Sequence, residues 1–503
     1  MSRRTVLALS GVTKRFGALT ANDDVSLALG EGEVLALLGE NGAGKTTLMN
    51  ILFGHYTADA GEVSVFGKVL PPGRPRAAIE AGVGMVHQHF TLAPNLTVLE
   101  NVMIGTERLD AIASDRRKGR ARLVAIAARF GLAVEPEARV GDLSVGERQR
   151  VEILKALYRD ARILILDEPT AVLTQVEAER LFGTLKGMAA EGLSVIFISH
   201  KLGEVMGAAD RVVVLRGGRV VAERDTRFTN RAELAELMVG RRVARPVRER
   251  RAPGPPLLVA DAVDVVEGGA KRLDGVSFTV RSGEILGVIG VSGNGQAALG
   301  RLVSGLAPPA VGRLTLAGAD IGRTPPRALV EAGVGRIPED RHAEGAVGEM
   351  TVWENAVLER VREPRFSRRG LVDRAAARAF AAALIERFDI RGATPDTRTR
   401  LLSGGNMQKL ILGRNLAGSP RLVVANQPTR GLDEGAIAAV HAELLAARAA
   451  GAGVLLISED LDEVTALADR VQAIVKGRLS PSVDTDAADA RTIGLMMAGV
   501  WET

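Results

Sequence analysis

The sequence carries one long pattern twice. Ala-Gly-Val-Gly at residues 81–84 recurs at residues 332–335, an offset of 251, and Pro-Thr at residues 169–170 recurs at residues 428–429, an offset of 259. The second copy therefore holds eight more residues than the first between these landmarks. Stacked solenoid repeats are only about 20–45 residues long, so a repeat of this length indicates a duplicated domain. A chain of 503 residues is also too long for one hydrophobic core.

The boundaries of the two domains follow from the segment between the copies. We expect the first domain at residues 1–240, a linker at residues 241–256 and the second domain at residues 257–503. The linker holds four prolines and a run of like charges, and both features favour an exposed connection without regular structure. A basic arm with a function of its own is the alternative.

Composition excludes several classes of protein. Hydrophobic residues make up 46% and charged residues 25%, which is typical of globular domains. Cysteine is absent, which excludes disulfides and thiolate metal sites and suits a reducing cytosol. No apolar run reaches the length of about 18 residues that a membrane-spanning helix needs. The net charge of +5 comes from scattered residues, 65 basic against 60 acidic, and therefore indicates a solvated surface rather than a nucleic-acid site.

Short apolar runs alternate with helical stretches in the first copy. Residues 33–38, 163–166 and 195–198 read as buried strands, and residues 47–52 read as a helix. Near-continuous apolar strands alternating with helices predict a parallel sheet covered on both faces. Residues 90–160 contain few strand-like runs and read as an inserted helical subdomain. The predicted fold class is therefore α/β.

A glycine-rich loop lies between the first of these strands and the helix. Residues 39–46 read Gly-Glu-Asn-Gly-Ala-Gly-Lys-Thr, the spacing of a phosphate-binding loop. Small residues let backbone N–H groups approach phosphates, and the following helix directs its positive end at them. Lys45 is expected to meet the β and γ phosphates of ATP, and Thr46 to place its hydroxyl on Mg²⁺. A plain strand-to-helix turn explains the glycines but not the Lys-Thr pair. The predicted nucleotide-binding residues of this segment are Gly39, Asn41, Gly42, Ala43, Gly44, Lys45, Thr46 and Thr47.

Two adjacent carboxylates follow the strand at residues 163–166. Ligands of open α/β sheets bind at the carboxyl ends of strands, which is where Asp167 and Glu168 lie in the sequence. Asp167 suits the Mg²⁺ shell, and Glu168 can orient and polarise an attacking water. An ordinary pair of strand-end carboxylates is the alternative, which the phosphate-binding loop upstream disfavours.

A further motif completes a resemblance to a known family. Leu-Ser-Val-Gly-Glu at residues 143–147 and Leu-Ser-Gly-Gly-Asn at residues 402–406 are similar to the signature motif of ATP-binding-cassette (ABC) ATPases. The chain resembles two such cassettes in tandem, each with an inserted α-helical subdomain. The resemblance implies that Gln88 is the Q-loop glutamine, which reaches Mg²⁺ and the reacting phosphate. It also implies that His200 is the switch histidine near the γ-phosphate and that Phe16 stacks on adenine.

The second copy keeps the frame but loses the chemistry. Gln296 and Ala297 stand where the lysine and threonine of the first loop stand, and Asn426 and Gln427 replace the two carboxylates. Neutral amides cannot act as carboxylate ligands or as a general base. The second copy is therefore expected to carry degenerate Walker A and Walker B motifs.

In the ABC family two cassettes pair head to tail, so each ATP lies between the loop of one and the signature of the other. The resemblance thus implies that Ser403, Gly404 and Gly405 complete the site of the first loop. The other site would combine Gln296 and Asn426 with an altered signature. One competent ATP site is the expectation.

Tandem cassettes without a membrane span resemble the ATPases of bacterial importers. Residues 85–90, 427–433 and 457–463 look closest to the nucleoside branch, and the sugar branch is the alternative. The resemblance implies two membrane permease subunits as partners, a substrate-binding lipoprotein as an indirect one, and a peripheral place on the cytoplasmic face of the bacterial inner membrane. A soluble translation factor with tandem cassettes is a third reading, but it would need a long helical linker and two competent sites.

Overall fold

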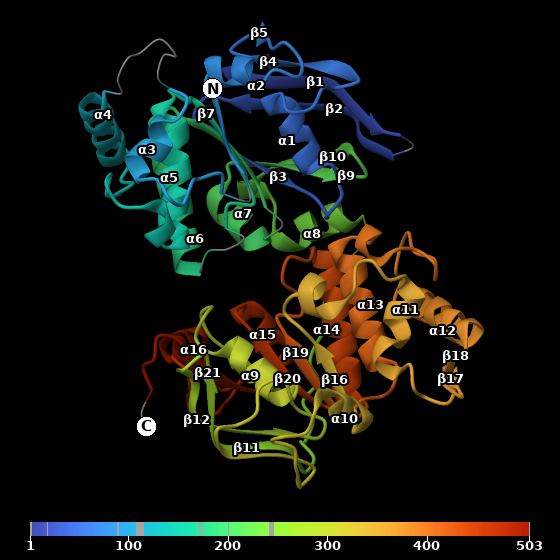
Figure 1. Ribbon diagram of the computed structural model, residues 1–503. Helices are drawn as coiled ribbons and strands as arrows, with labels where there is room; N and C mark the ends of the chain where they lie inside the picture. The colour runs from blue at the N-terminus through green and yellow to red at the C-terminus, as the bar shows by residue number, and fades with distance from the viewer. Residues whose placement is uncertain are drawn as a thin grey trace. The chain divides into compact units, whose positions relative to one another are not determined.

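The computed structural model describes residues 3–17, 19–87, 90–106, 115–170, 173, 175–199, 201–240 and 246–501. Two of the predicted site residues, Gln88 and His200, lie outside these ranges. The chain divides into two compact units, Met1–Val243 and Ala244–Thr503, which run from blue to green and from yellow to red in Figure 1. Within the described part of the chain, no helix combines the length and the apolar character that spanning a bilayer requires.

The first unit contains an antiparallel sheet, β2-β1-β4-β5, and a mainly parallel sheet, β10-β9-β3-β8-β7-β6. The strands are β1 (Thr5–Phe16), β2 (Leu19–Gly30), β3 (Val34–Leu38), β4 (Ala60–Val65), β5 (Lys68–Val69), β6 (Val83–Val86), β7 (Ile163–Asp167), β8 (Ser194–Ile198), β9 (Arg211–Arg216) and β10 (Arg219–Asp225). Parallel pairing joins β3 to β8 and β9, and β7 to β6 and β8. Every residue of β3, β7 and β8 is buried, as their continuous apolar runs predict.

Alternate residues of β3 belong to different hydrophobic cores. Val34, Ala36 and Leu38 pack in a core that the inserted helices and the helices after β7 complete. Leu35 and Leu37 pack in a second core with the helix after the glycine-rich loop and with the antiparallel sheet. The sheet is therefore covered on both faces, which confirms the predicted α/β class.

Helices of the first unit follow the strands and fill the inserted segment. They are α1 (Lys45–Phe53), α2 (Pro75–Glu80), α3 (Val98–Met103), α4 (Arg116–Arg129), η1 (Val140–Asp142), α5 (Val145–Tyr158), α6 (Gln175–Ala190), α7 (Leu202–Ala208), η2 (Thr226–Phe228) and α8 (Arg231–Val239). The segment at residues 90–160 is helical as predicted, and α3, α4 and α5 form a group to one side of the sheets (Figure 1). A capping box between Thr97 and Glu100 starts α3.

The second unit repeats this topology. Its antiparallel sheet has the order β12-β11-β14-β15, and its mainly parallel sheet has the order β16-β19-β20-β13-β21-β22, with β23 on β21. The strands are β11 (Pro256–Glu267), β12 (Ala270–Arg281), β13 (Ile285–Ile289), β14 (Val311–Leu316), β15 (Ala319–Asp320), β16 (Val334–Ile337), β17 (Ser367–Arg368), β18 (Leu371–Val372), β19 (Leu422–Asn426), β20 (Gly453–Ser458), β21 (Arg470–Val475), β22 (Arg478–Leu479) and β23 (Val483–Asp484). β17 and β18 form a separate hairpin.

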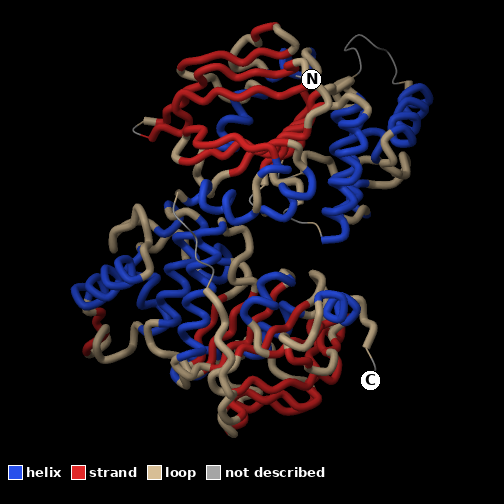
Figure 2. Tube along the Cα trace, turned by 180° about the vertical axis from the view of Figure 1, so that it is seen from behind, coloured by secondary structure: helices blue, strands red, loops and turns tan. Residues whose placement is uncertain are grey.

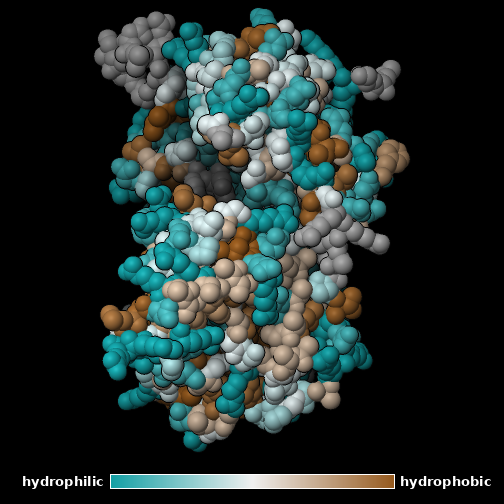
Figure 3. All heavy atoms as spheres, turned by 90° about the vertical axis from the view of Figure 1, so that its right-hand side faces the viewer, coloured by the Kyte–Doolittle hydropathy of each residue, from teal (hydrophilic) through white to brown (hydrophobic). Residues whose placement is uncertain are grey.

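The helices of the second unit also match those of the first. They are α9 (Gln296–Val303), α10 (Pro326–Glu331), η3 (Arg341–Gly345), α11 (Val352–Val357), η4 (Leu358–Arg360), α12 (Arg374–Arg387), η5 (Thr399–Leu401), α13 (Gly404–Leu416), α14 (Glu434–Ala449), α15 (Leu461–Leu467) and α16 (Ala490–Met497). Figure 2 shows that in each unit the strands gather together, with the inserted helices beside them. In the view of Figure 3, hydrophilic residues are spread over the surface with hydrophobic ones between them.

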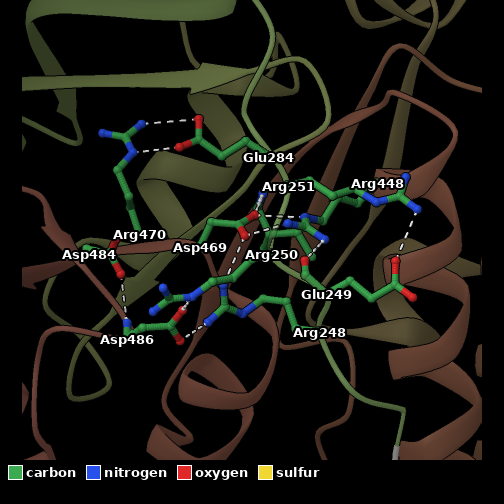
Figure 4. A network of polar contacts seen from close by, with 11 residues as sticks. Arg248, Glu249, Arg250, Arg251, Glu284, Arg448, Asp469, Arg470, Asp484 and Asp486 are labelled. Atoms are coloured by element: carbon green, nitrogen blue, oxygen red, sulfur yellow. Dashed lines mark hydrogen bonds and ion pairs between the residues drawn. The ribbon is translucent and has the colours of Figure 1, made fainter.

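The described part of the predicted linker is attached to the second unit. Arg248 forms ion pairs with Asp469, at 3.1 Å, and with Asp486. Its side chain is only 9% exposed. Arg448 pairs with Asp469 at 2.6 Å and donates a hydrogen bond to the carbonyl oxygen of Glu249 (Figure 4). A connection that is mostly exposed, as its composition suggests, thus has a buried ionic anchor.

Candidate functional site

The glycine-rich loop of the first unit closes around the Lys45 side chain. β3 ends at Leu38 and α1 begins at Lys45. The ammonium donates hydrogen bonds to the carbonyl oxygens of Gly39, at 2.8 Å, and Glu40, at 2.9 Å, and the residue is 6% exposed. Gly44 has a φ of 97°, and a Cβ there would clash with the backbone oxygen of Ala21. The loop therefore needs glycine at this position and holds a cation at its centre.

The two carboxylates lie beside this loop. Asp167 ends β7 and is 6% exposed. Burial, and next the charge of Glu168, raises the pKa of Asp167 to about 6, while Lys45 and a hydrogen bond with Thr46 act in the opposite direction. The structure thus brings together Lys45, Thr46, Asp167 and Glu168 from two segments far apart in the sequence. Hydroxyl and carboxylate oxygens next to a phosphate-binding loop are ligands that suit Mg²⁺.

The turn that presents Glu168 has an unusual backbone. Its φ is 47°, in the left-handed region, and its N–H donates to the oxygen of Ile198 at 3.1 Å. Gln427 of the second unit has a φ of 49° and the same bond, to Ile457 at 2.8 Å. A non-glycine residue in this region costs roughly 1–3 kcal/mol. The turn is retained in both units although its carboxylate is present in only one.

Phe16 lies at the end of β1 with its ring available for stacking. It is 45% exposed. The rings of Phe16 and Tyr56 form a T-shaped pair with centroids 5.7 Å apart, and the ammonium of Lys14 lies 5.4 Å from the centroid of Phe16. Sequence reasoning missed Tyr56, because no spacing connects the end of β1 with the segment after α1.

A pair of histidines lies near the predicted Q-loop. The rings of His55 and His87 stack at 5.6 Å with an interplanar angle of 14°. Burial, and next the neighbouring His55, holds the pKa of His87 below its usual value. A neutral His87 ring can stack on His55 without charge repulsion, which agrees with that direction. Gln88, the next residue, lies outside the described residues, as does His200.

Both signature motifs start a helix. Ser403 is the N-cap of α13, and its hydroxyl accepts a hydrogen bond from the N–H of Asn406. Gly404 and Gly405 form the first turn, where an added Cβ on Gly404 would lie 3.2 Å from the guanidinium of Arg341. In the first unit Ser144 caps α5 in the same way. Exposed N–H groups at a helix start suit an anion.

Sequence reasoning also missed a buried carboxylate behind the site. Glu204 of α7 has a side chain that is 8% exposed. It accepts hydrogen bonds from the hydroxyls of Thr170 and Ser199. Thr170 follows the Glu168 turn, and Ser199 directly precedes His200. No motif signal marks Glu204 in one sequence, because its importance depends on which loops meet there.

Comparison with known proteins decides the family. A family model for the ABC transporter matches residues 22–171 and 273–430, one stretch in each unit. The chain belongs to the ABC transporter family. This confirms the predicted pair of tandem cassettes, and it makes this ABC transporter protein an ATP-binding protein and an ATPase.

Relatives of this ABC transporter protein cover its whole length. It is 45% identical, over 99% of its length, to the glucose import ATP-binding protein TsgD13 of Haloferax volcanii, 96% of which is covered. It is 44% identical to the nucleoside import ATP-binding protein NupA of Lactococcus lactis subsp. cremoris, with 99% of both chains covered. It is also 44% identical to the guanosine import ATP-binding protein NupO of Bacillus subtilis, with 98% of this chain and 97% of the relative covered.

A solved structure supports the fold over both units. The archaeal ribosome recycling factor aABCE1, in complex with the stalk protein aP1, aligns with 97% of this ABC transporter chain and 92% of its own, with a TM-score of 0.66. The two are 18% identical. The likeness is therefore one of fold.

Proposed function

We propose that this ABC transporter ATPase energises a membrane importer for nucleosides. Two relatives at 44% identity are a nucleoside and a guanosine import ATP-binding protein, and both align along nearly the whole chain. The segments at residues 85–90, 427–433 and 457–463 resemble the same branch. A monosaccharide importer is the second candidate, favoured by the glucose import relative at 45% identity.

The partners follow from this proposal. Two permease subunits in the membrane would provide the translocation path, and a substrate-binding lipoprotein would deliver the nucleoside to them. The ATPase would then lie on the cytoplasmic face of the bacterial plasma membrane as a peripheral subunit. The three relatives described above, at 44–45% identity, all bear import names. No nucleic-acid partner is proposed.

ATP would bind at the loop of the first unit with Mg²⁺ beside it. Lys45, now hydrogen-bonded to loop carbonyl oxygens, carries the charge that β and γ phosphates need. Thr46 and Asp167 fit Mg²⁺ because a hydroxyl and a carboxylate already meet there. When bound, the ion would neutralise charge on the phosphate oxygens. Phe16 would stack on adenine.

Glu168 is the proposed group that orients the attacking water. It directly follows Asp167, the proposed Mg²⁺ ligand, in the turn after β7 at the carboxyl edge of the sheet. Gln88 and His200 would contact the reacting phosphate. By family resemblance, Ser403, Gly404 and Gly405 would complete the site from a second-unit signature. A general base or a water-positioning residue contributes about 10²–10⁴-fold to rate.

One observation carries the proposal of a single competent site. The first unit holds the lysine, the hydroxyl and both carboxylates. The second unit keeps the same backbone turn at Gln427, but amides replace the lysine and the carboxylates and an alanine replaces the threonine. The Glu168→Gln variant tests it. We expect ATP turnover to fall at least 100-fold while ATP binding persists. The Gln427→Ala variant is the matched control and should keep normal turnover. Turnover that survives Glu168→Gln would contradict the assignment.

The transported molecule needs a separate test. The ATPase co-expressed with its permeases in vesicles should hydrolyse ATP faster when a nucleoside-loaded binding protein is supplied. Ribose or glucose in place of the nucleoside should give no stimulation. Stimulation by the sugar alone would support the second candidate, and purification with ribosomes instead of permeases would contradict both.

A further inference from the structure

The loop of the second unit is filled by a side chain of its own. Gln296, at the start of α9, is 4% exposed. Its amide nitrogen donates to the oxygen of Val291 at 2.8 Å, and its amide oxygen accepts from the backbone N–H of Asn294 at 3.0 Å. A Cβ on Gly290 would lie 2.9 Å from the same amide nitrogen. Both polar atoms of the buried side chain are therefore hydrogen-bonded to the backbone of the loop.

The first loop differs in the acceptor that this N–H meets. The N–H of Ala43, which corresponds to Asn294, donates to the backbone oxygen of Glu40 at 3.0 Å rather than to the side chain at position 45. Lys45 donates to Glu40, which corresponds to Val291, at 2.9 Å. Lysine has three donors and no acceptor, so it cannot take up an N–H group of its loop. A glutamine side chain has both donors and an acceptor, and the amide oxygen of Gln296 accepts a hydrogen bond from the N–H of Asn294. Backbone N–H groups of such a loop are what binds phosphate oxygens. The amide oxygen thus stands in for a phosphate oxygen.

Asn294 ties the filled loop to the neighbouring turn. It corresponds to Ala43 of the first unit, and its side-chain nitrogen donates to Val291 at 2.9 Å. Its side-chain oxygen accepts from the N–H of Lys476 at 2.8 Å, and its backbone oxygen accepts from Gly477 at 2.8 Å. Opening this loop for a phosphate therefore requires several hydrogen bonds to break, without the gain of a lysine charge.

The place next to the loop is also changed. A cavity of about 50 Å³ lies between α9, β16 and β19, lined in part by Ala297, Gly300 and Asn426. A cavity of this volume holds a few water molecules. Glu267 stands where Phe16 stands in the first unit, and it pairs with Arg301 at 2.9 Å. An ionised carboxylate at that position does not favour an adenine ring or a triphosphate.

We propose that Gln296 keeps nucleotide phosphates out of the second loop by filling it from within, so each chain binds ATP only at residues 39–46. This inference deepens the proposed function and rests on it. Gln296 is a specificity-determining residue: it decides which of two similar loops takes ATP. The degenerate cassette therefore contributes its fold and its signature motif, but it does not bind a second nucleotide.

Counting bound nucleotides tests the inference. The full chain with Glu168→Gln, which prevents turnover, is titrated with ATP and Mg²⁺ by calorimetry. We expect one nucleotide per chain, and none when Lys45→Ala is added. Two nucleotides per chain, falling to one with Lys45→Ala, would overturn the inference but leave the proposed function standing. A chain that binds none, or whose single site ignores Lys45→Ala, would instead overturn the proposed function.

A gain of binding tests Gln296 itself. The double change Gln296→Lys and Ala297→Thr, in the same Glu168→Gln chain, restores the lysine and the hydroxyl, and should raise the count from one to two. Ala297→Thr alone keeps Gln296 and should leave it at one. A count of one for the double variant, with unchanged thermal unfolding, would overturn the inference, as would two for Ala297→Thr alone. If the double variant does not fold, the number of nucleotides bound by the Glu168→Gln chain, with and without Ala297→Thr, tests the inference: one in each chain supports it, and two in either overturns it.

Discussion

The hydroxyl of Thr170 donates to the carboxylate of Glu204, 2.7 Å and 2.8 Å from its two oxygens. Ser199 donates to the same carboxylate at 2.9 Å. Glu204 thereby joins the segment after Glu168 to the end of β8. The second unit has the same arrangement: Glu463 accepts hydrogen bonds from Thr429 at 2.8 Å and from Ser458 at 2.6 Å. This unit lacks the two carboxylates found at the end of β7 in the first unit.

This pair of arrangements offers a matched test of positioning. We expect Glu204→Gln to lower kcat about tenfold or more, a loss of about 1.4 kcal/mol in transition-state stabilisation, with little change in KM for ATP. Glu463→Gln should leave kcat unchanged. Both should cost comparable stability, about 1.5–3 kcal/mol, because each weakens hydrogen bonds to a buried charged group. Steady-state ATPase kinetics and denaturant unfolding measure these effects. Equal kcat in the two variants would show that Glu204 acts on stability alone.

Lys45 should be indispensable for ATP binding. Lys45→Met removes the buried ammonium that the loop encloses, so we expect the Kd for ATP to rise at least 100-fold, which corresponds to about 2.7 kcal/mol. Lys186→Met, at an exposed position of α6, is the control and should bind as before. Fluorescent nucleotide titration measures both. An unchanged Kd for Lys45→Met would mean that ATP binds elsewhere.

The raised pKa of Asp167 predicts a pH dependence of Mg²⁺ binding. Below its pKa of about 6 the carboxyl is protonated, and a proton then competes with the metal. We expect the Mg²⁺ concentration for half-maximal ATPase activity to rise about tenfold per pH unit below 6 and to be level above it. Saturating Mg²⁺ should restore the rate. A half-maximal concentration that stays constant down to about pH 5 would contradict the assignment of Asp167 as a metal ligand.

The same pKa has a consequence for stability. Because the folded state holds this proton more tightly than the unfolded chain, the contribution of Asp167 is most favourable below about pH 4. It then falls as pH rises to about 6. Asp167→Asn should remove this dependence. Denaturant unfolding of both chains at pH values from about 4 to 7 measures it, and parallel curves would argue against a raised pKa.

The buried linker anchor should stabilise the second unit. Arg248→Met leaves Asp469 and Asp486 without one partner in a site where Arg248 is 9% exposed. We expect a loss of about 2–4 kcal/mol, since removing one member of a buried ion pair is costly. Arg250→Met is the control: Arg250 is 79% exposed and should contribute about 0–1 kcal/mol. If the two units unfold in separate calorimetric transitions, we expect Arg248→Met to lower the midpoint temperature of the second unit only. An equal decrease in both midpoints would contradict the assignment of Arg248 as an anchor of the second unit.

Elements with strong local patterns were predictable from the sequence. The strand predicted at residues 33–38 is Val34–Leu38, and the helix predicted at residues 47–52 is Lys45–Phe53. Both follow from continuous apolar runs on either side of a glycine-rich turn. The antiparallel sheet of β1, β2 and β4 was not predicted. Its strands alternate buried and exposed residues with irregularities in register, which weakens their period of two.

The site was predictable only in part. Lys45, Thr46, Asp167 and Glu168 were predicted as site residues because their types and spacing are specific, and the structure brings them together around Asp167. The contacts of Glu204 with Thr170 and of Tyr56 with Phe16 were not predicted, since both join residues that are distant in the sequence. The anchor at Arg248 was missed for the same reason, because Asp469 and Asp486 lie more than 200 residues away.

The sequence by itself determined which chemical groups each copy carries. One copy has a lysine and two carboxylates where the other has three amides. Because side-chain charge is a property of residue type, the sequence alone shows that only the first copy has charged groups at these positions. Only the tertiary structure decided how those groups behave. Burial raises the pKa of Asp167, and the loop geometry lets Gln296 accept from Asn294. Solvation and hydrogen-bond distances depend on segments that meet in space, which one-dimensional spacing does not contain.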